Sequence, residues 1–150
     1  MPSGGAFAVA LAALAGLAGS VQVAVMGRFG ERVGIFAAFV FASLIGTALG
    51  FGGLLVSDRS LRGLSDALRE PAWLWTGGLF GMFIVLTVTF SPPRIGTTAT
   101  VALLIAGQLA MAAAIDRFGW FGQDAIPLAW PRVLGIVLLA AGAALALYRS

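Results

Sequence analysis

The sequence predicts an all-α integral membrane protein of five transmembrane helices, and two observations carry that prediction. Of the 150 residues, 60% are hydrophobic and only 10% are charged, whereas soluble domains average about 25% charged residues. The charged residues are also confined to short segments. Five stretches contain none: residues 1–27, 33–57, 71–93, 95–115 and the shorter 133–148. About 20 apolar residues of α-helix cross the roughly 30 Å hydrocarbon core of a bilayer. We therefore expect a single membrane domain over residues 1–150, with spans near 5–26, 35–56, 72–90, 97–114 and 127–148.

The first predicted helix begins near the N-terminus and leads into a polar turn at residues 27–34. This turn carries Arg28, Glu31 and Arg32 between glycines, which accept positive φ. The apolar run of the helix is too long for the core of a signal peptide, and no basic segment precedes it, so we expect the helix to be retained. The second helix, 35–56, follows directly.

The largest loop, residues 58–70, separates the second and third helices and holds three arginines and three acidic residues. Its leucines at 61, 64 and 68 have the spacing of a short amphipathic surface helix. The third helix, 72–90, is expected to end at Ser91-Pro92-Pro93, because proline lacks a donor N–H and clashes with the preceding turn.

The fourth and fifth helices are joined by an aromatic loop at residues 118–122. Thr97 or Thr98 is expected to cap the fourth helix through its hydroxyl. The fifth helix is expected to begin near Pro127 and to end at Tyr148. Its apolar run is short, so we expect Arg132 to extend its guanidinium toward the lipid head groups.

Glycine pairs with GxxxG spacing occur in the second and third helices. They are Gly46 with Gly50, and Gly77 with Gly81. Helices in lipid associate through close packing, so such pairs favour helix–helix interfaces.

The nine arginines are divided almost evenly between the two sides of the membrane, and the chain has no clear positive side. On the side of the N-terminus lie Arg59, Arg62, Arg69, Arg117 and Arg132; on the other lie Arg28, Arg32, Arg94 and Arg149. All four tryptophans, at 73, 75, 120 and 130, fall on the N-terminal side. An inverted pair of chains would supply aromatic belts at both interfaces. The sequence thus predicts insertion in both orientations and an antiparallel, ten-helix homodimer; insertion in one orientation is the alternative.

Several short motifs of the chain resemble those of a known family. They are QVAVMGRFGERVG at 22–34, SLIGT at 43–47, GGLFG at 77–81, PRIG at 93–96, GQ at 107–108 and DRFG at 116–119. Together they are similar to the YdcZ-like branch of the drug/metabolite transporter superfamily, five-helix proteins regarded as inner-membrane exporters. The resemblance covers nearly the whole chain and implies membrane transport, often with dual topology. Two departures are Met26, where the family tends to have Asn, and Arg117, where it tends to have His.

Polar side chains within the spans are the candidate substrate contacts. Gln22 and Gln108 offer amide donors and acceptors to a ligand; the alternative for both is a hydrogen bond between helices. Ser43, Thr87 and Thr100 are weaker candidates, because Ser and Thr in membrane helices usually bond to their own backbone.

Aromatic residues of the third helix are a further candidate pocket wall. Phe80, Phe83 and Phe90 are able to line an apolar or cation–π pocket, and the alternative is packing against other helices. No Asp, Glu, Lys or Arg lies near the middle of any span. Since embedded ionisable groups usually mark coupling sites, this argues against simple carboxylate-based proton exchange.

Two charged residues near the ends of the fourth helix are candidates for inter-chain or gating roles. Asp116 opposes the helix dipole and needs a cationic partner. Within the chain that partner is Arg117 or Arg132, whereas in an antiparallel dimer an arginine of the second chain becomes reachable. Arg94 precedes the positive end of the helix and is able to attract an anion.

The sequence therefore predicts a small-molecule transporter, an exporter by resemblance, that works as a homodimer in the bacterial inner membrane. The resemblance places its pocket between the first, third and fourth helices of both protomers. A dual-topology ion channel and a subunit that requires a paralogous partner are the alternatives. With no His and no Cys, the sequence excludes thiol chemistry, disulfides, haem ligation and His-based zinc sites, and we expect no cofactor and no metal site. It also lacks a nucleophile–base pair and a basic run, which argues against an enzyme and against nucleic-acid binding. Its expected partners are lipid, a second copy of itself and a small-molecule or ion substrate.

Overall fold

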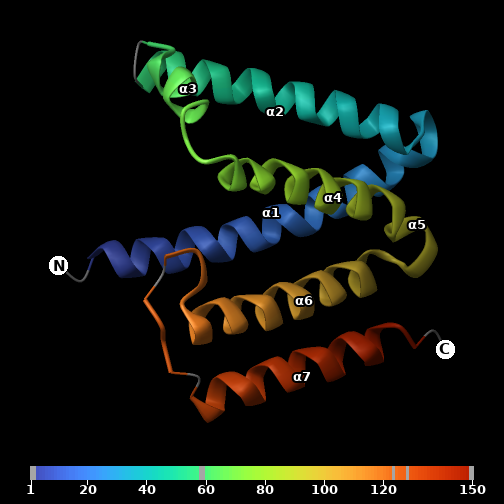
Figure 1. Ribbon diagram of the computed structural model, residues 1–150. Helices are drawn as coiled ribbons and strands as arrows, with labels where there is room; N and C mark the ends of the chain where they lie inside the picture. The colour runs from blue at the N-terminus through green and yellow to red at the C-terminus, as the bar shows by residue number, and fades with distance from the viewer. Residues whose placement is uncertain (1–2, 58–59, 123, 128, 149–150) are drawn as a thin grey trace. The chain divides into compact units, whose positions relative to one another are not determined.

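The computed structural model describes residues 3–57, 60–122, 124–127 and 129–148, and every regular element within these ranges is a helix (Figure 1). The chain divides into two compact units. One comprises Met1–Ala24 and Ser91–Ser150, and the other comprises Val25–Phe90. The long helix α1 (Ser3–Val33) contributes its first part to one unit and its last part to the other.

The connection between α1 and α2 (Ile35–Ser57) is a single residue, Gly34. Gly34 has φ of 92°, a conformation that glycine adopts without the steric cost other residues carry. Its N–H donates to the carbonyl of Gly30 at 2.9 Å. The polar turn expected at residues 27–34 is therefore wrong, because Arg28, Glu31 and Arg32 belong to the last turns of α1. Their helix-forming tendency continues the helix until a residue with positive φ ends it.

The segment after α2 contains the short helix α3 (Arg62–Ala67), as the leucine spacing predicts. The 3-10 turn η1 (Ala72–Trp75) then leads into α4 (Thr76–Phe90), which ends before Ser91 as expected. Trp75 Nε1 donates to the carbonyl of Ala67 at 3.1 Å and so ties α3 to the end of η1, directly before α4.

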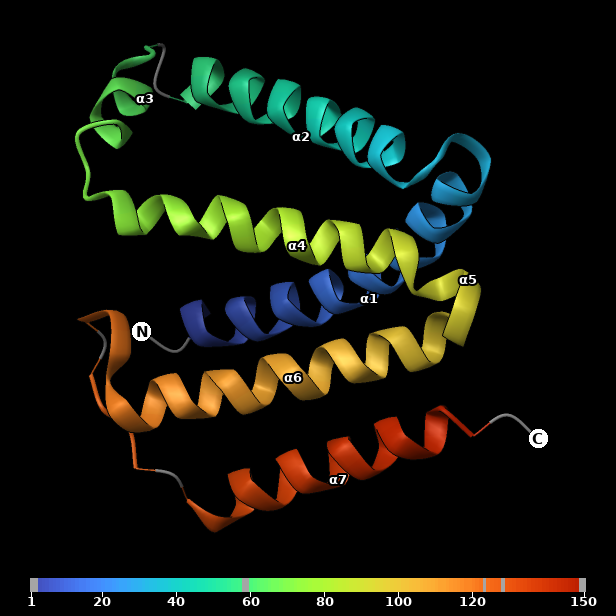
Figure 2. The ribbon, with the colours of Figure 1, turned by 45° about the vertical axis from the view of Figure 1, so that its right-hand side comes forward.

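Packing in the unit Val25–Phe90 is concentrated where α4 meets its neighbours. Helices α2 and α4 lie side by side in both views (Figures 1 and 2). The end of α1 meets the end of α4 at Gly30, where an added Cβ would lie 2.5 Å from Thr89 Cγ2. Thr89 is almost completely buried, and its hydroxyl donates to the carbonyl of Val85 at 2.7 Å. The ring of Phe29 meets that of Phe41 edge-on, with 5.8 Å between centroids, and secures the corner between α1 and α2.

The second unit contains α5 (Pro92–Ile95) and α6 (Thr97–Phe118), joined at Gly96. Gly96 occupies the N-cap position of α6, and its cap has no side-chain hydrogen bond. The expected cap by Thr97 or Thr98 is therefore wrong, since both residues already lie inside the helix. Pro92 and Pro93 lie in the first turn of α5. Proline is tolerated there because the N–H groups of a first helical turn have no carbonyl partner within the helix.

Helix α6 ends at Gly119, which adopts the left-handed conformation typical of helix C-termini. The 3-10 turn η2 (Trp120–Gly122) and an extended stretch then lead to α7 (Trp130–Ala146). The fifth predicted helix thus starts three residues after Pro127, with Pro131 accommodated in its first turn. Helices α6 and α7 pack side by side in both views (Figures 1 and 2).

Among the residues that the structure describes, four helical segments are long and apolar enough to cross a membrane: Gly5–Val33, Ile35–Ser57, Ala72–Ile95 and Thr97–Phe118. Helix α7 has 17 residues and falls below that length. Most large apolar side chains on the spanning helices are exposed, for example Val9 at 72% and Leu49 at 72%. In a bilayer such surfaces contact lipid or another protein.

Candidate functional site

The candidate pocket residues fall into the two units. Gln22, Thr100 and Gln108 belong to the unit formed by Met1–Ala24 and Ser91–Ser150, whereas Ser43, Phe83 and Thr87 belong to Val25–Phe90. Within the second unit the structure brings two of them together, because Thr87 Oγ1 donates to the carbonyl of Phe83 at 2.8 Å.

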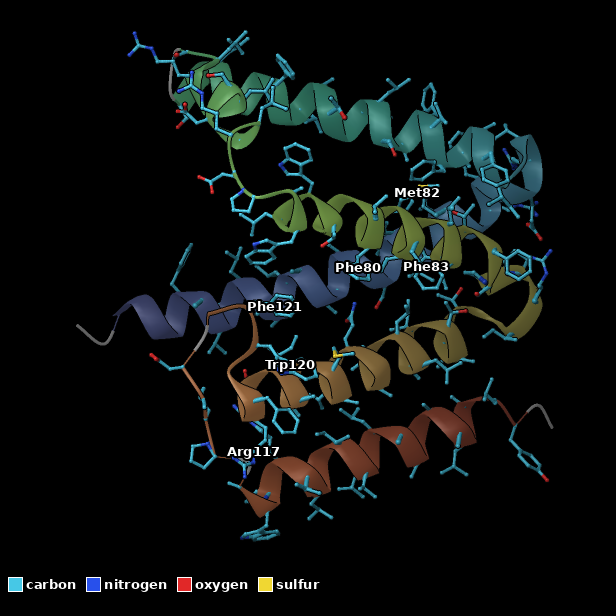
Figure 3. The ribbon with its side chains drawn as sticks, viewed as in Figure 1. Phe80, Met82, Phe83, Arg117, Trp120 and Phe121 are labelled. Atoms are coloured by element: carbon cyan, nitrogen blue, oxygen red, sulfur yellow. The ribbon has the colours of Figure 1, made fainter. Side chains whose placement is uncertain are left out.

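An aromatic face of α4 is the clearest candidate binding surface. Phe80, Phe83, Thr87 and Phe90 recur at three- and four-residue spacing and so share one face of the helix. Figure 3 shows Phe80 and Phe83 on the side of α4 opposite Met82, which points toward α2. Within the chain Phe80 is 65% exposed and Phe83 is 70% exposed. This face is therefore available to another helix or to a ligand.

The threonine candidates have their hydroxyls satisfied locally. Thr87 bonds to Phe83, and Thr100 Oγ1 donates to the carbonyl of Gly96 at 2.8 Å. Thr100 is also only 2% exposed. These bonds to the preceding turn are the backbone alternative considered for such residues.

Three other polar candidates have open hydrogen-bonding capacity. Gln22, Ser43 and Gln108 are exposed, and none of them forms a side-chain hydrogen bond with any residue that the structure describes. Among these three residues, Gln108 has the greatest need for a hydrogen-bond partner, because it lies halfway along α6. A primary amide without partners in hydrocarbon is costly. These side chains therefore call for water, a ligand or a second protein chain.

Asp116 forms an ion pair within its own chain. Its Oδ2 lies 2.8 Å from Nη1 of Arg132, so the structure selects Arg132 rather than Arg117 as the intra-chain partner. In addition, the backbone carbonyl of Asp116 accepts the N–H of Ile126 at 2.7 Å. Together these bonds tie the end of α6 to the connection and to the start of α7. Arg94 lies in α5 with an exposed side chain.

The structure also reveals a feature that the sequence reasoning did not single out. A groove of about 340 Å³ lies along the last turns of α1 and is lined by Val25, Arg28, Phe29 and Arg32. The spacing of the two arginines, one helical turn apart, was a signal for it. The signal was missed because residues 27–34 were expected to form a turn.

The two departures from the family pattern have different surroundings. Met26 is 5% exposed and belongs to the packed face of α1, whereas Arg117 is exposed at the end of α6 (Figure 3). No group of three or more Asp or Glu residues able to hold a metal ion occurs in the part of the chain that the structure describes.

Apolar helices of spanning length, with exposed apolar surfaces and short connections, define a multi-pass integral membrane protein. Residues 7–145 match the model of the family described as "Putative inner membrane exporter, YdcZ". The chain therefore belongs to this YdcZ family, as the motifs predicted. It is 31% identical to the inner membrane protein YdcZ of Escherichia coli (strain K12) over 118 residues, which cover 77% of each chain.

No solved structure matches the chain. The family and the apolar helices together place this protein in the bacterial inner membrane as a multi-pass protein.

Proposed function

We propose that this protein is a small-molecule exporter that works as an antiparallel homodimer by alternating access. The observation that carries the proposal is the open amide of Gln108 halfway along α6, in a chain that belongs to an exporter family. An amide at that depth is most stable when it contacts a transported molecule, the water of a transport pathway or the second chain.

The proposed protomer is one domain of five spans over residues 1–150, with α7 as the fifth. The 17 residues of α7 reach roughly 26 Å at 1.5 Å per residue. That length falls a few Å short of the hydrocarbon core, and Arg132 at the first turn closes the difference by reaching the head groups. An odd number of spans puts the two ends of the chain on opposite sides of the membrane.

The near-even division of arginines supports insertion in both orientations. Two inverted copies of one chain form an inverted repeat, the architecture in which secondary transporters exchange inward- and outward-facing states. The exposed GxxxG pairs of α2 and α4 support close contact with another helix, because nothing lies within 4 Å of a Cβ added at Gly46, Gly50, Gly77 or Gly81.

The proposed substrate contacts are given for each unit by itself. In the unit Val25–Phe90 they are the aromatic face of α4, with Ser43 and Thr87 as secondary contributors, and in the other unit they are the open amides of Gln22 and Gln108, with Thr100 as a secondary contributor. Because residues 35–57, 71–93 and 95–115 contain no charged side chain, these three spans offer no counter-ion to a charged substrate. The pocket is therefore suited to an uncharged molecule with aromatic or apolar surface and a few polar groups.

A vesicle experiment tests this proposal. Purified protein is reconstituted into liposomes loaded with uncharged nitrophenyl glycosides, and their efflux is followed by absorbance. We expect saturable efflux from wild-type vesicles and a rate near that of protein-free vesicles for Phe83→Ala. Phe7→Ala is the matched control, because Phe7 is equally exposed at 70% but lies near the start of α1. Efflux that rises linearly with concentration would favour a channel, and equal loss in both variants would exclude the proposed pocket.

A further inference from the structure

We propose that the groove along the last turns of α1 binds the phosphate headgroup of an anionic membrane lipid. This site is separate from the transport pocket and does not depend on the proposed function.

The groove lies on one face of α1. Val25, Arg28, Phe29 and Arg32 follow the i, i+3, i+4, i+7 spacing that brings residues onto one side of a helix. The opposite side of the same turns is packed, since Met26, Gly27 and Gly30 are buried. The contact of Gly30 with Thr89 thus directs the groove away from α4.

The apolar part of the groove is held in place. Phe29 packs edge-on against Phe41, with an interplanar angle of 79°. Val25 lies one turn before Phe29, further into the apolar span, and is 58% exposed. The groove therefore presents an apolar wall toward the membrane interior and two guanidinium groups toward its end, which matches the order of acyl chain and phosphate in a lipid.

The charge of the groove is positive and only partly compensated. Arg28 Nη1 lies 2.9 Å from Glu31 Oε2, but Arg32 has no acidic partner among the residues that the structure describes. Two like charges at i and i+4 repel each other on a helix. A phosphate between the two arginines would relieve that repulsion and accept paired N–H donors from each guanidinium.

The depth of the groove selects a lipid over a soluble anion. The span Gly5–Val33 has 29 residues and reaches roughly 44 Å, which exceeds the hydrocarbon core of about 30 Å by roughly two and a half turns. Its last turns therefore reach the head-group region. The single-residue connection at Gly34 keeps both arginines there, because α2 enters the apolar layer at Ile35.

Native mass spectrometry of the full-length protein tests the proposal. The protein is exposed in detergent to equal amounts of phosphatidylglycerol and phosphatidylcholine, and the retained lipid is counted. We expect wild type to retain phosphatidylglycerol and Arg28→Gln/Arg32→Gln to lose that preference, by about fivefold per arginine. Arg69→Gln/Arg117→Gln is the matched control, because it removes the same charge from two exposed arginines outside the groove. Equal loss in the control pair would overturn the proposal.

Two further variants keep the proposal testable if the double variant Arg28→Gln/Arg32→Gln fails to fold. Glu31→Gln removes the competing carboxylate, and we expect it to increase retention of phosphatidylglycerol. Val25→Trp fills the groove without changing charge, and we expect it to reduce retention. No change in either variant would contradict the site. Displacement of the lipid by millimolar glycerol phosphate would also overturn the proposal, because it would show a site for soluble anions.

Discussion

Gly30 on α1 lies directly against Thr89 on α4. A Cβ added to Gly30 would come within 2.5 Å of the Thr89 Cγ2 methyl and 3.3 Å of the Thr89 carbonyl oxygen. Thr89 cannot turn away freely, because its hydroxyl is bonded to the carbonyl of Val85 and the residue is buried. The absence of a side chain at Gly30 is thus what allows the ends of the two helices to meet.

Substitution of Gly30 by Ala is expected to destabilise the protein by about 1–3 kcal/mol, the usual cost of overpacking a close contact. Thermal unfolding in detergent, followed by size-exclusion chromatography, measures the effect. We expect Gly30→Ala/Thr89→Ser to recover part of the loss, because serine lacks the methyl group that clashes. Gly19→Ala on the same helix serves as the control, since no atom lies within 4 Å of its added Cβ. A Gly30→Ala protein as stable as the control would show that this contact does not exist in the membrane.

The ion pair of Asp116 and Arg132 predicts a small but specific coupling between α6 and α7. The side chains are 27% and 44% exposed, so we expect a coupling free energy of only about 0.2–1 kcal/mol, as for other solvent-accessible pairs. A double-mutant cycle with Asp116→Asn and Arg132→Gln, measured by thermal unfolding, gives this term.

The charge swap Asp116→Arg/Arg132→Asp should be more stable than either single reversal. Arg117→Gln is the control. Arg117 carries the same charge as Arg132 and follows Asp116 directly in the sequence, but it forms no ion pair among the described residues. If the stability losses of the two single variants simply add, the ion pair is refuted. An arginine of the second chain would then be the expected partner of Asp116.

The sequence was sufficient to predict a helical membrane protein, because only long charge-free runs are stable in the hydrocarbon core of a bilayer. It was also sufficient for the end of α4, where Ser91-Pro92-Pro93 stops the helix by local chemistry. It failed at residues 27–34 because charged residues and glycines are compatible with both a turn and a helix end. In the structure the helix continues to Val33, and the positive φ of Gly34 ends it. The contact of Gly30 with Thr89, 59 positions away in the chain, leaves no local signal in the sequence.

The candidate site shows the same limit. Local spacing correctly places Phe80, Phe83 and Phe90 on one face of α4, since helical periodicity alone determines it. Which amides lack partners was not predictable, because hydrogen-bond satisfaction depends on the neighbours of each helix. Only the structure separates the open Gln108 from the backbone-bonded Thr100.

The number of spans is testable by counting labels on single molecules. Asp124→Cys/Ser150→Cys places thiols before and after α7 in a chain with no other cysteine. Intact cells are treated with a membrane-impermeant maleimide, and the purified protein is weighed by mass spectrometry. Five spans place the two thiols on opposite sides, so we expect one label on every molecule whichever way it inserts. Molecules with none or two labels would show that α7 does not cross.

Cross-linking of single cysteines distinguishes an antiparallel dimer from a parallel one. In an inverted pair, residues near the midplane of the membrane lie at the same depth in both chains, whereas the two C-termini lie on opposite sides. Gln108→Cys, halfway along α6, should therefore form dimers with a short bis-maleimide, and Ser150→Cys should not. Met111→Cys is the matched control on the same helix, less than one turn away and 56% exposed. A parallel dimer would reverse the result at Ser150, because both C-termini would then lie on one side. Dimers from Gln108→Cys but not from Met111→Cys would further show that the amide-bearing face of α6 turns toward the second chain, as a shared pocket requires.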